Sequence, residues 1–168
     1  MTARARGGWL AFAMVAIWML VLNPVRLDQT VHAGGLSMKV PFLWTPMQVA
    51  GKEMPVALRR EWAPFLPAGS VNVMDLAELG SKNGPWTMES ARRAQADLAS
   101  FPSRDSRLSN PQSFDLKAGD HTAVCVESTA GDDDRLLVCY IVGTPLQFSF
   151  DGSRFSEPAA RRMLASLS

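Results

Sequence analysis

Two cysteines are the residues whose type and spacing could most directly do chemistry. Cys125 and Cys139 are the only cysteines in the chain, and they flank the turn-forming run 130–134. A hairpin centred on Asp132 pairs residues whose numbers sum to 264, so it places the two thiols directly opposite each other. Opposed Cβ atoms in antiparallel strands lie about 4.5–5.5 Å apart, near the distance that a disulfide requires.

Three interpretations of this pair differ in chemistry: a structural disulfide, two free buried thiols, or a redox-active pair. An even number of facing cysteines favours a structural disulfide if the domain lies in an oxidising compartment. Redox chemistry is disfavoured because the spacing is not Cys-x-x-Cys and no predicted helix begins beside either thiol. We therefore predict a disulfide between Cys125 and Cys139.

The other candidate site residues give no catalytic or metal-binding set. His121 shares a strand with Cys125, but four residues of strand separate them by about 13 Å, too far for a nucleophile–base hydrogen bond. His32 and His121 are the only histidines, too few for the usual zinc spacings. The acidic run 132–134 lacks the terminal glutamate of an EF-hand loop. We predict no catalytic residue, no metal and no cofactor.

The N-terminus predicts a membrane anchor. Residues 9–22 are wholly apolar, and nineteen residues separate Arg6 from Arg26, about the length that a spanning helix needs. A cleaved signal ending near Ala33 and a buried helix of a soluble protein are the alternatives. Basic residues before the span favour a cytoplasmic N-terminus.

This interpretation divides the chain into four parts and places it in the cytoplasmic membrane as a single-pass protein with its domain in the periplasm. The predicted parts are a cytoplasmic basic tail (1–8), a transmembrane anchor (9–25), a linker (26–35) and an extracytoplasmic domain (36–168).

The periodicity of the domain predicts an α+β fold in which three or four antiparallel strands are accompanied by a few short helices. Strands are expected at 36–44, 114–117, 121–128, 135–142 and 146–150, and helices at 55–63, 87–100 and 156–167. The segment 70–80 fits a helix or a strand equally well. The segment 101–112 is predicted to be a loop.

Aromatic residues gather in the segment from Leu36 to Trp86, which has no regular periodicity. They are Trp44, Trp62, Trp86, Phe42 and Phe65. Either they form part of the core, or they form a contact surface for a protein partner, since aromatic residues anchor interfaces. We take the second interpretation as the functional hypothesis.

Composition and motifs narrow the function. The net charge is only +1, so no strong field indicates nucleic acid. Three arginine doublets, at 59–60, 92–93 and 161–162, could face lipid headgroups, but acidic neighbours offset them. No nucleophile elbow, phosphate loop or dinucleotide fingerprint is present.

The leading hypothesis is a non-enzymatic accessory or assembly protein that binds a partner in an envelope complex. A small ligand-binding or sensory module, with a pocket lined by Phe148 and Tyr140, and a thiol-dependent or hydrolytic enzyme are the alternatives.

Overall fold

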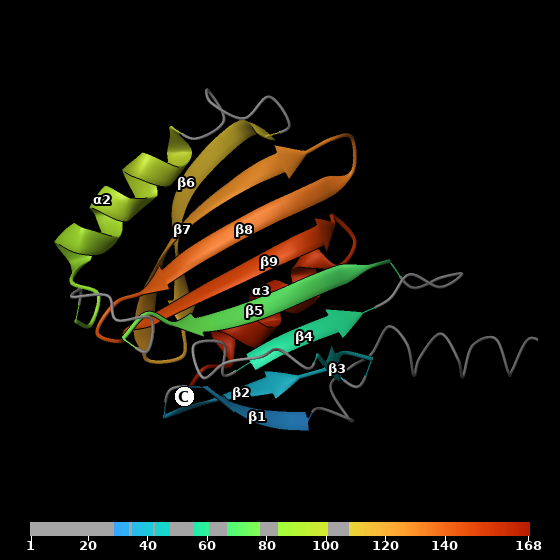
Figure 1. The fold of residues 1–168 in the computed structure, drawn as a ribbon, viewed down its shortest axis with the longest axis horizontal. Coiled ribbons are helices and arrows are strands. Elements are labelled where there is room, and N and C mark those ends of the chain that lie inside the picture. The colour runs from blue at the N-terminus through green and yellow to red at the C-terminus, as the bar shows by residue number, and fades with distance from the viewer. Residues whose placement is uncertain are drawn as a thin grey trace, which may run out of the picture.

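The computed structural model describes residues 29–33, 35–41, 43–47, 56–60, 67–77, 84–100 and 108–168. Within these ranges, an antiparallel sheet of seven strands forms the body of the molecule, with a two-stranded hairpin beside it (Figure 1). In spatial order the sheet contains β3 (Thr45–Pro46), β4 (Val56–Arg60), β5 (Gly69–Asp75), β9 (Leu146–Ser153), β8 (Asp134–Ile141), β7 (His121–Ala130) and β6 (Leu108–Ala118). The hairpin is β1 (Gln29–Ala33) with β2 (Leu36–Val40), and the described helices are α2 (Met88–Ala99) and α3 (Glu157–Ala165).

The register predicted for the cysteine hairpin is confirmed. β7 pairs with β8 so that Cys125 lies opposite Cys139. At the tip, Gly131 has a φ of +69°, a left-handed conformation that glycine adopts without a Cβ clash. The hairpin lies inside the sheet, between β6 and β9, so both of its strands are paired on both sides.

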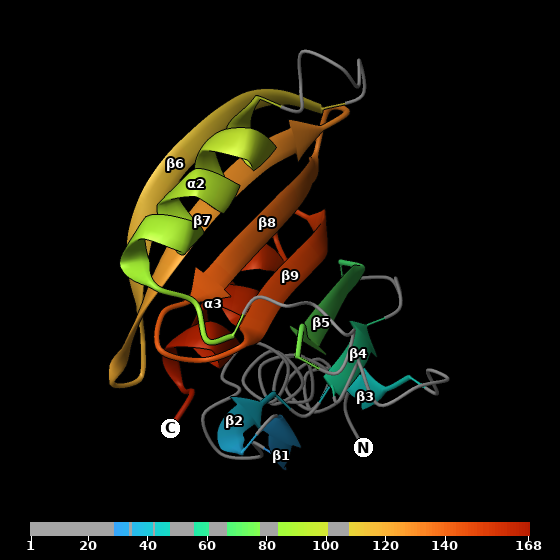
Figure 2. The ribbon, with the colours of Figure 1, turned by 60° about the vertical axis from the view of Figure 1, so that its left-hand side comes forward.

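The sheet carries a helix on each face, as Figure 2 shows. Because successive side chains of a strand point to opposite faces, the central strands β7 and β8 contribute to two separate hydrophobic clusters. The cluster under α3 includes Cys125, Cys139, Leu137, Phe148, Phe150, Met163 and Leu164. The cluster under α2 includes Ala91, Val124, Val138, Tyr140 and Trp86.

Two of the three predicted helices, those at 87–100 and 156–167, are present as α2 and α3. α2 begins after Thr87, whose side chain accepts a hydrogen bond from the Ser90 N–H while Ser90 bonds back to the Thr87 backbone, a reciprocal cap. α3 follows Ser156, but the Ser156 hydroxyl does not cap it. That hydroxyl lies within hydrogen-bond distance of the carbonyls of Pro67 and Ala68 instead, and so ties the start of α3 to the residues that precede β5.

The predicted fold class is wrong in its description of the domain. The sheet has seven strands instead of three or four, and the segment expected to be helical at 55–63 contains strand β4. None of the helices in the described ranges is long and apolar enough to cross a membrane. The predicted anchor, residues 9–25, lies outside the described residues, as do the tail at 1–8 and residues 26–28 and 34 of the predicted linker. The rest of the predicted linker is described, and its residues 29–33 form β1.

The pairing of β4 with β5 explains why the segment 55–63 contains a strand and not the predicted helix. Val56 and Leu58 face Val73 and Val71 of β5, and all four side chains are buried. Pro55 indicated the first turn of a helix because proline is favoured there, but burial of alternating apolar side chains against β5 decides for a strand.

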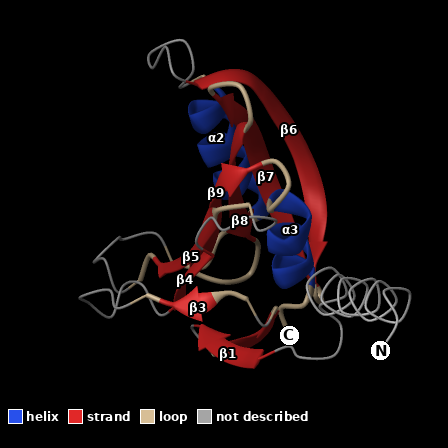
Figure 3. Cartoon of the chain, turned by 90° about the vertical axis from the view of Figure 1, so that its right-hand side faces the viewer, coloured by secondary structure: helices blue, strands red, loops and turns tan. Residues whose placement is uncertain are grey.

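The C-terminal residues are fixed against two other parts of the chain. Ser168 exchanges backbone hydrogen bonds with Ser37 of β2, at 2.8 and 3.0 Å. The Gly119 N–H, in the β6–β7 turn, donates to the Ala165 carbonyl at 3.2 Å. Leu167 between these contacts is fully buried. Figure 3 shows the C-terminus between α3 and the β1–β2 hairpin.

Candidate functional site

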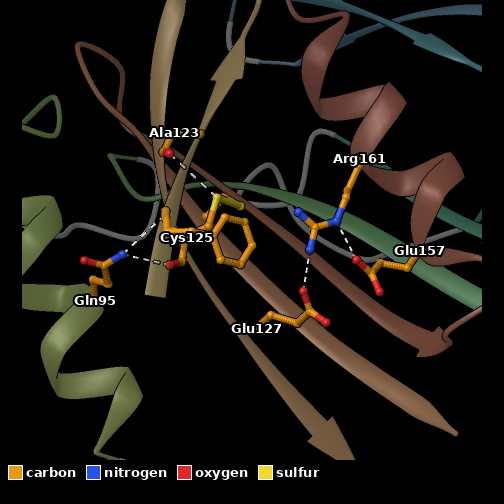
Figure 4. Close-up of a disulfide and its surroundings, with 8 residues drawn as sticks. Gln95, Ala123, Cys125, Glu127, Glu157 and Arg161 are labelled. Carbon is orange, nitrogen blue, oxygen red and sulfur yellow. Dashed lines mark hydrogen bonds and ion pairs between the residues drawn. A yellow bond between two sulfur atoms is a disulfide. The ribbon is translucent and has the colours of Figure 1, made fainter. Parts of the chain in front are cut away.

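The two cysteines form a disulfide in the middle of the sheet (Figure 4). Their Cα atoms are 4.1 Å apart, and both side chains are fully buried in the cluster under α3. The bonded sulfurs leave no thiol for the nucleophilic or redox chemistry that the sequence left open. A thiol enzyme based on Cys125 or Cys139 is therefore not supported.

Gln95 of α2 reaches the same strand from the opposite face. Its side-chain amide donates to the Cys125 carbonyl at 2.8 Å and lies 3.4 Å from the Phe114 carbonyl. The side chain is only 6% exposed, so these carbonyls satisfy an amide that would otherwise be buried without a partner. Figure 4 shows Gln95 and the disulfide on either side of β7.

His121 takes no part in chemistry with the cysteines. Its ring Nδ1 lies 3.2 Å from the Val142 carbonyl, which is in the strand-end turn beside it. His121 is the first residue of β7 and lies at the end of that strand remote from the hairpin tip. This position agrees with the separation from Cys125 that the strand geometry predicts.

A cluster of charged side chains lies beside α3 (Figure 4). The Arg161 guanidinium contacts the carboxylates of Glu157 and Glu127 and covers the Phe114 ring at 4.7 Å. Arg135 lies 3.5 Å from the other oxygen of Glu127. Two carboxylates therefore face two guanidinium groups, and the cluster holds α3 onto the edge of the cysteine hairpin. Arg161, which belongs to the arginine doublet at 161–162, therefore forms its ion pairs within the protein.

The acidic hairpin tip does not form a ligand cage in this structure. Asp133 pairs with Arg154 at 3.2 Å, which ties the tip to the turn after β9. In the described ranges, no group of three or more His, Cys, Asp or Glu side chains is placed to hold a metal ion.

Trp44 is a core residue. Its side chain is 0% exposed, and the Arg60 guanidinium covers its ring at 5.3 Å. Arg60 also donates to the Pro67 carbonyl at 2.9 Å and to the Ser156 hydroxyl at 2.8 Å. Burial, with a smaller contribution from Arg162, lowers the pKa of Arg60 below its usual value. These contacts join β4 to the start of α3.

Trp86 is buried on the other face of the sheet. It is 8% exposed and packs on Tyr140 with ring centroids 4.7 Å apart. Burial, and secondarily the charge of Asp97, raises the pKa of the Tyr140 hydroxyl. Trp86 also exchanges backbone hydrogen bonds with the β8–β9 turn, through Gly143 and Thr144.

The predicted aromatic contact surface is therefore not assembled from the described tryptophans. Trp44 and Trp86 belong to different clusters on opposite faces of the sheet. Phe42, Trp62 and Phe65 lie outside the described residues, and for them the hypothesis stays a prediction. The pocket expected from Phe148 and Tyr140 is also divided by the sheet, since these two side chains lie in opposite clusters.

A polar surface that the sequence analysis did not single out lies on the α2 side of the sheet. α2 packs against β7, β6 and β8, and neither described helix covers the neighbouring strands β9 and β5 on this face (Figure 1). Five partly exposed side chains line it: Ser70, Asn72, Met74, Gln147 and Ser149. Asn72 lies directly opposite Ser149, and Met74 lies opposite Gln147. We call these five residues the open sheet face. The alternation of polar and apolar residues at 146–150 was the available signal, but pairing with β5 could not be read from it.

Comparisons with known proteins identify no family for this chain. No family model and no curated protein matches this chain. Twelve chains of solved structures match it. The solution structure of cyanobacterial PsbP (CyanoP) from Synechocystis sp. PCC 6803 is 15% identical, with a TM-score of 0.47 over 84% of this chain and 91% of that chain. A crystal structure from Bacteroides thetaiotaomicron VPI-5482 is 12% identical, with a TM-score of 0.43 over 82% of this chain and 46% of that chain. We draw no functional conclusion from either.

Proposed function

We propose that this protein is a non-enzymatic accessory protein of an oxidising, extracytoplasmic compartment, where it binds a protein partner. The observation that carries the proposal is the open sheet face: a paired two-strand surface that neither described helix covers, beside a core that is closed on the other face by α3.

The disulfide supports the proposed location in an oxidising compartment. Disulfides persist in oxidising surroundings and are rare where thiols are kept reduced. Both cysteines are fully buried and directly paired within the sheet, so the bond fits the fold without displacing either strand. A role in holding the domain together follows more naturally from this position than a role in exchange with other thiols.

The open sheet face supports binding of a polar protein surface. Asn72 and Gln147 present side-chain amides, which can both donate and accept hydrogen bonds. The Ser70 hydroxyl is 3.4 Å from the Asp151 carbonyl and the Ser149 hydroxyl is 3.5 Å from the Asn72 carbonyl, so these side chains lie close against the sheet. Met74 adds an adaptable apolar contact. A flat face of this composition suits the polar interfaces of non-obligate complexes.

Site-specific crosslinking in the native host tests this surface. A photoreactive residue in place of Asn72 should yield one discrete protein adduct, and the same residue in place of exposed Lys39 on β2 should not. Ser149→Arg, which adds a long charged side chain beside Asn72, should abolish the adduct while the protein remains folded by circular dichroism. An Asn72 adduct that persists in Ser149→Arg, or the absence of any adduct, would contradict the proposal.

Alkylation of the protein as the cells are lysed in denaturant, followed by mass measurement, tests whether the protein lies in an oxidising compartment. Without reduction and under denaturing conditions, neither cysteine should take up the alkylating reagent, and after reduction both should. Free thiols in protein taken directly from cells would overturn the extracytoplasmic assignment without affecting the proposed binding surface.

A further inference from the structure

The two edges of the main sheet differ in how they are protected. One edge is β3, which has only two residues, including Pro46, and very short or proline-bearing edge strands resist further pairing. The other is β6, with 11 residues. The irregular register between Ser109 and Gln112 disrupts its first half. From residue 113 to residue 118 its pairing with β7 is regular, and we call this stretch the β6 edge.

The Cα–Cα distance of the disulfide-bonded pair indicates which backbone groups of the β6 edge point outward. A Cα–Cα distance of 4.1 Å between Cys125 and Cys139 is that of a non-hydrogen-bonded pair. The N–H and C=O of Cys125 therefore point away from β8 and towards β6, where Phe114 is the paired residue. Phe114 accordingly directs its own N–H and C=O towards β7.

Because these groups alternate along a strand, the neighbours of Phe114 direct theirs away from the sheet. They are Ser113, Asp115 and Lys117, and all three side chains are exposed. In the part of the chain that the structure describes, no backbone hydrogen bond outside the strand ladders reaches these residues. The β6 edge thus presents a row of free donors and acceptors of the kind that accepts an added strand.

We propose that the β6 edge pairs with the β6 edge of a second copy of this chain, antiparallel about a twofold axis at Leu116. In this register Asp115 lies opposite Lys117 of the second copy, and symmetry repeats the pair. Both are outward-facing positions, so they form two hydrogen-bonded pairs, each of which exchanges two N–H···O bonds. Opposite charges at directly opposed positions stabilise a strand pair.

Charge selects this register from its neighbours. A shift that centres the axis on Asp115 would place two carboxylates directly opposite each other, and a shift that centres it on Lys117 would oppose two ammonium groups. Like charges in these positions destabilise the pair. Arg92 of α2 binds only Oδ2 of Asp115, at 2.6 Å, so Oδ1 is available to the lysine of the second copy.

Sedimentation velocity over a range of protein concentrations tests the pairing. The wild type should show a reversible monomer–dimer equilibrium. Lys117→Glu places like charges opposite each other twice and should raise the dissociation constant by about tenfold. The double reversal Asp115→Lys/Lys117→Glu should restore it, and Lys39→Glu, a reversal on β2, should not change it. A wild type that stays monomeric at millimolar concentration, or a dimer indifferent to Lys117→Glu, would overturn the proposal.

Amide hydrogen exchange gives a second readout at residue level. The N–H groups of Asp115 and Lys117 should exchange rapidly in dilute protein and become protected as concentration rises. The N–H groups of Phe114 and Leu116, which point into the sheet, should be protected at every concentration. Equal protection of all four in dilute protein would contradict the outward direction of the β6 edge.

Discussion

Gln95 and Cys125 are joined across the sheet: the Gln95 amide donates to the Cys125 carbonyl at 2.8 Å from one face, while the Cys125 sulfur bonds to Cys139 on the other. One residue of β7 therefore connects α2 to the cluster that α3 covers. The two layers of the core are separate in their packing, and this residue links them through its backbone.

Replacement of Gln95 by leucine should destabilise the protein by about 1–2 kcal/mol, because the buried volume is kept while the Cys125 carbonyl loses its second donor. Urea denaturation measures the change in the free energy of unfolding. Arg93→Ala is the matched control on the exposed side of α2, where the side chain makes only an exposed pair with Glu89, and it should change stability by less than about 0.5 kcal/mol. Equal effects of the two substitutions would show that Gln95 contributes no specific bond.

The disulfide should contribute less than its loop length suggests. A loop of this size is worth about 3 kcal/mol when closure is the only constraint on the unfolded chain, and the separation is 14 residues. Because the β7–β8 turn already favours these strand neighbours, Cys125→Ala/Cys139→Ala should cost about 1–3 kcal/mol in urea denaturation. The wild type should resist reduction below its unfolding transition, since both sulfurs are buried. Rapid reduction of the native protein would contradict this.

Alanine substitutions at Gly119 and Gly131 distinguish the cost of a strained backbone from the cost of a steric clash. A Cβ on Gly119 would lie 1.5 Å from the Leu167 carbonyl oxygen, whereas a Cβ on Gly131 would meet nothing within 4 Å. Both have positive φ, +58° and +69°. Gly131→Ala should therefore cost about 1–2 kcal/mol, the price of a left-handed alanine, and Gly119→Ala should cost more because the C-terminal residues must move. Thermal unfolding measures both, and equal melting temperatures for the two variants would argue against the clash.

The parts of the fold that could be predicted from the sequence are those determined by neighbours along the chain. The Cys125–Cys139 register follows from a turn centred on Asp132, and α2 follows from its cap at Thr87. In each case the determining residues lie within one short stretch of the chain, so the pattern of residue types was sufficient.

The rest depends on pairing between distant segments. β5 is a strand because Val71 and Val73 lie opposite Phe150 and Phe148 of β9, more than 70 positions later in the chain. The same pairing creates the open sheet face, so it could not be predicted from either segment alone. Trp44 was expected at a contact surface, but it is buried because β4 and α3 meet around it.

Glu127 should contribute more to stability than an exposed carboxylate in the same kind of pair. Its side chain is 19% exposed and faces both Arg161 and Arg135, whereas Glu89 is 84% exposed and faces only Arg93. Glu127→Ala leaves Arg135 without its carboxylate partner and Arg161 with Glu157 alone, and should cost about 1–3 kcal/mol because both guanidinium groups are partly buried. Glu89→Ala should cost less than about 0.5 kcal/mol. Urea denaturation at moderate salt compares them, and similar losses would mean that solvent screens the Glu127 cluster completely.

Asp151 should make the protein less stable as pH rises through the acidic range. Burial, and then the charge of Asp134, raises the pKa of Asp151 above its usual 3.8. The native state therefore holds this proton more tightly than the unfolded chain, so the contribution to stability is full below the unfolded pKa and is lost as pH rises through the folded pKa. Asp151→Asn removes this loss, and its stability relative to wild type should increase from pH 3 to pH 7 in urea denaturation. Asp134→Asn should lower the pKa of Asp151 and give a smaller gain of the same sign, because the charge of Asp134 is the lesser of the two causes. A relative stability of Asp151→Asn that falls over this range would contradict the raised pKa.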